Sequence, residues 1–127
     1  MKTTEDKGLK TRYSDEELKE FDLLLDEKLE KAKEQLAYYE EILEEQANNS
    51  DAKVKGLDDG ASTQETEATA RMAGRTRKHI EHLQNAKIRI QNKVYGVCRE
   101  TGKLISKERL RAVPHATLSI EAKKARK

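Results

Sequence analysis

The stretch YGVCRETGKLI at residues 95–105 contains the one cysteine of the sequence and could be part of a zinc site. Cys98 has the position of the first ligand in a C-x-x-C zinc knuckle, but Thr101 stands where the second ligand would be. A structural zinc site needs four ligands that converge tetrahedrally. The second pair would fall on Ser119 and Ala122, which are not zinc ligands. We therefore expect no metal at these four degenerate positions and interpret Cys98 as a small buried core residue.

Signatures of enzymes are absent from the sequence. It contains no phosphate-cradling glycine loop, no Gly-x-Ser-x-Gly motif and no H-E-x-x-H motif. A nucleophilic Cys–His pair is not indicated either, because nothing orients His115 as a base. The sequence predicts a protein that is not an enzyme and has no catalytic residues.

Two adjacent carboxylates, Asp58 and Asp59, lie in the polar segment 47–61, and Gly60 and Ala61 follow them. A solvated turn with Asp-Gly chemistry explains this pattern. The alternative is a carboxylate pair that a stiff element carries into a basic or metal-containing cavity of a partner. From the residues alone both interpretations stay open.

The composition limits the fold and the compartment. Of 127 residues only 35% are hydrophobic and 4% aromatic, while 39% are charged. Such a chain is either disordered or built of long helices with narrow apolar seams. It has no apolar run for a membrane span and no secretory signal, and a single cysteine forms no intramolecular disulfide. These features predict a cytoplasmic protein without a membrane partner.

The charges are distributed unevenly. Residues 14–50 hold 13 acidic residues and four lysines, whereas residues 99–127 hold nine basic and three acidic residues. The basic residues are either solvated or grip an anionic ligand or an acidic partner surface. The acidic segment would repel phosphate, so sequence-specific DNA binding is not expected.

The spacing of the apolar residues indicates long helices and not disorder. Ser14 followed by Glu17 is a capping-box signal, and Ser62 with Glu65 repeats it. After the first box, apolar residues recur at steps of three and four: Leu18, Phe21, Leu25, Leu29, Ala32, Leu36, Tyr39 and Leu43. After the second box, a similar stripe consists of Ala73, Thr76, Ile80, Leu83, Lys87, Ile90 and Val94. Two seamed helices joined by a polar loop predict an antiparallel coiled-coil hairpin.

The predicted fold class is mainly α. Residues 1–13 are expected to form a flexible leader, and residues 14–94 the hairpin with a tip loop at about 47–61. Residues 95–127 are expected to form a small zinc-finger-like head without metal, a short closing helix after Pro114, and a basic tail.

The head carries a family resemblance. Residues 95–123 resemble the DksA/TraR family of RNA-polymerase-binding transcription factors, whose zinc-bearing members read Y/F-G-x-C-x-x-C-G and then R-L-x-A-x-P-x-A-x-x-C-x-x-C-K. The sequence departs from this pattern at three of the four ligands, so it resembles a cysteine-depleted branch. The matching residues are Tyr95, Gly96, Cys98, Gly102, Arg109, Leu110, Ala112, Pro114, Ala116, Leu118 and Lys123.

The resemblance implies a bacterial transcription regulator that inserts its coiled coil into the secondary channel of RNA polymerase. It places Asp58, Asp59 and Ala61 at the tip of the coiled coil, near the catalytic magnesium. It implies the alarmone (p)ppGpp as an effector, with Arg75 and Lys123 as contacts, and no other cofactor. We expect a monomer. The alternatives are a coiled-coil adaptor or oligomerisation module without polymerase contact, and a zinc-dependent nucleic-acid binder.

Overall fold

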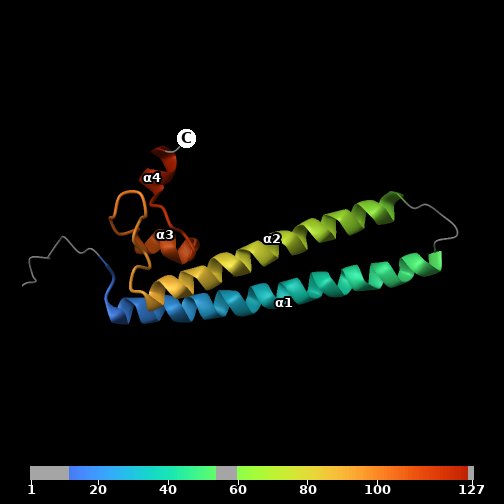
Figure 1. Ribbon diagram of the computed structural model, residues 1–127, viewed down its shortest axis with the longest axis horizontal. Coiled ribbons are helices and arrows are strands. Elements are labelled where there is room, and N and C mark those ends of the chain that lie inside the picture. Colours follow the sequence, from blue (N-terminus) through green and yellow to red (C-terminus); the bar gives the residue numbers. More distant parts are fainter. Residues whose placement is uncertain (1–11, 54–59, 126–127) are drawn as a thin grey trace, which may run out of the picture. The chain divides into compact units, whose positions relative to one another are not determined.

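The computed structural model describes residues 12–53 and 60–125. Within them the chain forms four helices, α1 (Asp15–Lys53), α2 (Gly60–Gln91), α3 (Lys107–Ala112) and α4 (Ile120–Ala125) (Figure 1). The described part holds no strand beyond a single antiparallel bridge between Val97 and Leu104. The prediction of a mainly α fold is confirmed.

The start of α1 follows from its sequence. The Ser14 hydroxyl oxygen accepts a hydrogen bond from the Glu17 backbone N–H at 3.1 Å. The Glu17 carboxylate in turn accepts from the Ser14 backbone N–H at 2.8 Å. These two bonds satisfy backbone donors that a helix start leaves unpaired, and the predicted capping box is confirmed.

The helix ends differ from the sequence expectation. α1 continues to Lys53, through the first residues of the segment expected to be a loop. α2 begins at Gly60, so Ser62 lies inside the helix and does not mark its start. The polar segment contains no proline that would stop either helix. Asp58 and Asp59 lie outside the described residues.

The described chain divides into two compact units, and the first combines residues up to Lys28 with residues from His82 onward. Its core is aromatic: the ring of Phe21 lies 5.8 Å from that of Tyr13 and 5.4 Å from that of Tyr95. The sequence predicts that Tyr13 belongs to the leader, yet its side chain is only 5% exposed in the core of this unit. The expected boundary between residues 94 and 95 also falls within this unit. Its largest fully buried side chains are Tyr95, Phe21, Leu25, Leu83, Ile105, Leu110 and Cys98.

Ion pairs join α1 to α2 and α3 in the first unit. The Lys87 ammonium contacts both Asp22, at 2.9 Å, and Asp26. A second pair joins Asp15, at the start of α1, to Lys93, just after the end of α2, at 2.6 Å. Residue numbers rise along α1 as they fall along α2, so the helices run antiparallel. On α3, Lys107 pairs with Glu17 at 2.9 Å.

The second unit, Leu29–Glu81, holds the rest of α1 and the first part of α2. Arg77 pairs with Glu40 at 3.3 Å, and Thr66 donates to the Gln46 side-chain oxygen at 2.9 Å. These contacts again join two antiparallel helices. The seam is narrow, and its buried members are Leu29, Ala32, Ala73, Thr76 and Ile80. The predicted coiled-coil pairing is thus confirmed within each unit. None of the described helices combines the length and apolar composition needed to cross a membrane.

Candidate functional site

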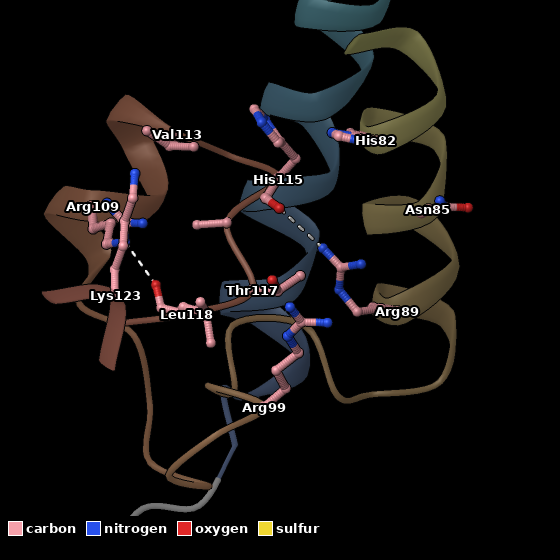
Figure 2. A pocket seen from close by; sticks show the side chains of 11 residues that line it. His82, Asn85, Arg89, Arg99, Arg109, Val113, His115, Thr117, Leu118 and Lys123 are labelled. Atoms are coloured by element: carbon pink, nitrogen blue, oxygen red, sulfur yellow. Dashed lines mark hydrogen bonds between the residues drawn. The ribbon is translucent and has the colours of Figure 1, made fainter. Parts of the chain in front are cut away.

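A pocket of about 710 Å³ lies within the first unit (Figure 2). Its wall comes from α2, α3 and α4 and from the turns that connect them. Four of the lining residues carry a positive charge, and no aspartate or glutamate is among the lining residues. The lining residues are His82, Asn85, Arg89, Arg99, Arg109, Val113, His115, Ala116, Thr117, Leu118 and Lys123.

The turn between α3 and α4 forms one wall of the pocket, and donors from other elements hold it in place. Four of its backbone carbonyls accept hydrogen bonds from outside the turn, so these carbonyls are paired although the turn belongs to no helix or strand. The bonds run from the Tyr95 hydroxyl to Pro114 (2.8 Å), from Arg89 to His115 (3.4 Å), from the Arg99 backbone N–H to Thr117 (3.0 Å), and from Arg109 Nε to Leu118 (2.8 Å).

Arg89 contributes a half-buried positive charge. Burial lowers its pKa, the neighbouring Tyr95 raises it and the nearby Arg99 lowers it again. A guanidinium nevertheless stays protonated in proteins. Within residues 12–53 and 60–125 none of Arg89, Arg99, Arg109 and Lys123 takes part in an ion pair. The pocket therefore concentrates positive charge that no carboxylate of its own wall offsets, and an anion is the chemical class it suits.

Two imidazole rings meet in the same pocket. The ring centroids of His82 on α2 and His115 in the α3–α4 turn are 5.5 Å apart, with an angle of 41° between the ring planes. His82 is exposed and His115 is half-buried.

The four degenerate ligand positions gather beside the pocket. Cys98 Sγ accepts a hydrogen bond from the Ser119 backbone N–H at 3.4 Å, and Ser119 Oγ accepts from the Ala122 backbone N–H at 3.1 Å. The Thr101 side chain also bonds the Cys98 sulfur. Cys98 is fully buried, which confirms its interpretation as a core residue.

Competing effects act on the Cys98 thiol. Burial raises its pKa, whereas hydrogen bonds from the Thr101 side chain and from the backbone of Ser119, Thr101 and Glu100 lower it. The bonds prevail, and the pKa is lowered to about 6. Donors that point at the sulfur favour the thiolate because they stabilise its negative charge.

The other predicted site residues are separated. Ala61 lies in the first turn of α2, directly after the residues that are not described. Arg75 is an exposed residue of α2 in the second unit and does not line the pocket. Lys123, on α4, does line it. Sequence reasoning did not single out Arg89 or Arg99, and the only available signal was their clustering with the basic head.

Comparisons with known proteins connect this geometry to a family. Residues 93–126 match the family model described as the prokaryotic dksA/traR C4-type zinc finger. Over 105 residues the chain is 38% identical to the RNA polymerase-binding transcription factor DksA of Caulobacter vibrioides (strain NA1000 / CB15N), and the match covers 76% of this chain and 74% of that protein. The chain belongs to the DksA/TraR family. The resemblance seen in the sequence is therefore confirmed.

Two further relatives of this DksA/TraR protein differ in how much they match. General stress protein 16O of Bacillus subtilis (strain 168) is 38% identical over 72 residues, which are 53% of this chain and less than half, 44%, of that relative. The structure of transcription factor DksA2 from Pseudomonas aeruginosa superposes with a TM-score of 0.74 and 24% sequence identity. That match covers 86% of this chain and 81% of the other, and it supports the fold.

The expectation that this chain holds no cofactor and no zinc is wrong. The matched family model describes a C4-type zinc finger, and this finding points to zinc binding. The donor set of this chain does not fit that description, because four thiolates are required and the sequence has one cysteine. Among the described residues no three His, Cys, Asp or Glu side chains gather for a metal ion. We therefore derive no functional step through zinc.

Proposed function

We propose that this DksA/TraR protein is a bacterial transcription regulator that binds RNA polymerase, acts in the cytoplasm and catalyses no reaction. One observation carries the proposal: the 38% identity over 105 residues to a protein named an RNA polymerase-binding transcription factor, most of whose length is matched. The absence of an enzyme motif in the sequence agrees with a role based on binding.

The proposed mechanism uses the paired helices. α1 and α2 enter the secondary channel of the polymerase, and the segment between Lys53 and Gly60 leads. Asp58 and Asp59, with Ala61 beside them, then act on the initiating complex through their charge and position. Antiparallel pairing in the second unit supports this mechanism, because the chain must reverse between the two helices.

The proposed effector is (p)ppGpp. The cationic pocket supports it, because phosphate groups are recognised by arginine and lysine side chains. Lys123 is proposed to contact the alarmone from the pocket wall. Arg75 is proposed as a further contact, from an exposed position on α2 where the described residues offer it no ion pair.

Two measurements on purified components test the function. The first is binding of the tagged chain to core RNA polymerase, with and without (p)ppGpp. Recovery of polymerase subunits is the expected result, whereas self-association without polymerase would favour the adaptor alternative and refute the proposal. We expect a monomer in solution.

The second measurement isolates the tip. The Asp58→Asn/Asp59→Asn variant is expected to bind polymerase and to lose promoter-specific regulation in transcription with purified components. Glu44→Gln/Glu45→Gln is the matched control, because it removes two charges from exposed positions of α1. A tip variant that regulates as the parent does would show that these carboxylates have no role.

A further inference from the structure

The segment just before α1 contacts the loop that follows α2. We propose that residues 12–14 form a strap that holds the 96–105 loop closed, and that this loop opens together with the α3–α4 turn while the paired helices stay folded. The opening is a property of the isolated chain, so it does not depend on polymerase.

The 96–105 loop closes where its two ends meet. The Ile105 backbone N–H donates to the Gly96 carbonyl at 2.7 Å, and Val97 and Leu104 form the antiparallel bridge beside this bond. Apart from that bridge, the loop belongs to no helix or strand. Few backbone hydrogen bonds must therefore break for the loop to open, and segments of this kind open locally before the helices unfold.

The Tyr13 side chain of the strap contacts both residues that close the loop. Its ring lies so close to Gly96 that a Cβ there would be 2.7 Å from two ring carbons, and its hydroxyl donates to the Ile105 carbonyl. The Lys107 ammonium lies 6.0 Å from the centroid of the same ring and pairs with Glu17 at 2.9 Å. The strap therefore joins the base of the loop to the start of α1.

The loop in turn holds the turn between α3 and α4. The Arg99 backbone N–H donates to the Thr117 carbonyl at 3.0 Å, and the Ser119 backbone N–H donates to Cys98 Sγ at 3.4 Å. Opening of the loop removes both bonds, so the strap and the turn are coupled through the loop. The coupling is reciprocal: whatever stabilises the closed turn also stabilises the closed strap.

The size of the effect follows from one hydrogen bond. Tyr13→Phe keeps the ring against Gly96 and removes the donor to the Ile105 carbonyl, and Ile105 is fully buried. An unpaired buried carbonyl destabilises the closed loop but not the open one, where water reaches it. We expect the population of the open loop to rise roughly tenfold.

Cys98 reports the opening directly, because it is the one cysteine of the sequence and is fully buried. Iodoacetamide reacts with it only when the loop is open, and mass spectrometry gives the rate. In the parent protein this rate should hardly depend on urea below the unfolding transition, since local opening exposes much less surface than global unfolding.

Matched variants assign the opening to the strap. Tyr13→Phe should be labelled about tenfold faster than the parent. Tyr38→Phe is the control, because it makes the same chemical change at an exposed tyrosine of α1 in the second unit, and its rate should stay within about twofold of the parent's. Circular dichroism establishes that the helices of both variants are intact.

Hydrogen exchange tests the coupling to the turn. In Tyr13→Phe the backbone amides of Arg99 and Ser119 should exchange faster by the same factor as the labelling rate. The amides of Leu25 and Leu83, whose side chains are fully buried in the paired helices, should exchange as in the parent.

Four results would overturn the inference. The first is labelling of the parent with the full urea dependence of global unfolding. The second is a Tyr13→Phe rate no higher than that of Tyr38→Phe. The third is unchanged exchange at Arg99 and Ser119, and the fourth is an equal acceleration of every amide, which would show a general loss of stability.

Discussion

The close approach of the Tyr13 ring to Gly96 leads to a quantitative prediction for Gly96→Ala. Gly96 has a φ of 82°, in the left-handed region that residues with a side chain rarely adopt. A Cβ at this position would lie 2.7 Å from two ring carbons of Tyr13 and 3.3 Å from Leu110 Cδ1. The substitution therefore brings both backbone strain and a steric clash.

The clash is costly because the ring cannot easily move. Tyr13 packs against Phe21, and its hydroxyl donates to the backbone carbonyl of Ile105. Strain at positive φ costs about 1–2 kcal/mol, and loss of the buried hydrogen bond costs about 1 kcal/mol more. Repacking of the ring destabilises the folded state by a similar amount. The substitution also lowers the conformational entropy of the unfolded chain, which offsets about 0.5 kcal/mol of the loss. We expect the free energy of unfolding to fall by about 2–4 kcal/mol in total.

Urea unfolding provides the assay, followed by circular dichroism and by tyrosine fluorescence. Gly102→Ala is the matched control, since Gly102 also has a positive φ, 74°, but no other atom lies within 4 Å of the place that its Cβ would occupy. The free energy of unfolding of Gly102→Ala should fall only by the cost of backbone strain, about 1–2 kcal/mol. In a Tyr13→Ala background the extra cost of Gly96→Ala should largely disappear. Equal losses for the two glycine variants would refute the steric reasoning.

Three further predictions concern single residues. Tyr95→Phe removes the buried donor to the Pro114 carbonyl and should lower the free energy of unfolding by about 1–3 kcal/mol, measured by urea unfolding. The pKa of the Cys98 thiol is lowered to about 6 from 9.0, so the thiolate's contribution to the free energy of unfolding is complete above about pH 9 and is lost as the pH falls toward 6. The urea concentration at the unfolding midpoint should therefore fall over this pH range in the parent protein and stay unchanged in Cys98→Ala. Thiolate absorbance that appears only near the ordinary cysteine pKa would contradict this. Gly74→Ala should raise the thermal unfolding midpoint and add about 0.5–1 kcal/mol to the free energy of unfolding, because Gly74 lies within α2 and no neighbour lies within 4 Å of the added methyl group. A lower midpoint would contradict this prediction.

Local features of the fold could be predicted from the sequence. The Ser14–Glu17 capping box and the apolar stripes depend on neighbours three or four residues apart, so they can be found without knowing the rest of the structure. The prediction was less accurate at the helix ends. α1 continues past residue 47 to Lys53, because isolated polar residues do not stop a helix that contains no proline.

The sequence by itself determined the paired helices, the family and the chemistry available to the chain, since each depends on residue types at short, regular spacing. Only the tertiary structure decided which of many basic residues share a pocket. Arg89, Arg99, Arg109 and Lys123 come from four segments, and no helix or strand period places them on one face. The same is true of Tyr13 against Gly96, because contacts between distant segments arise only when the core closes.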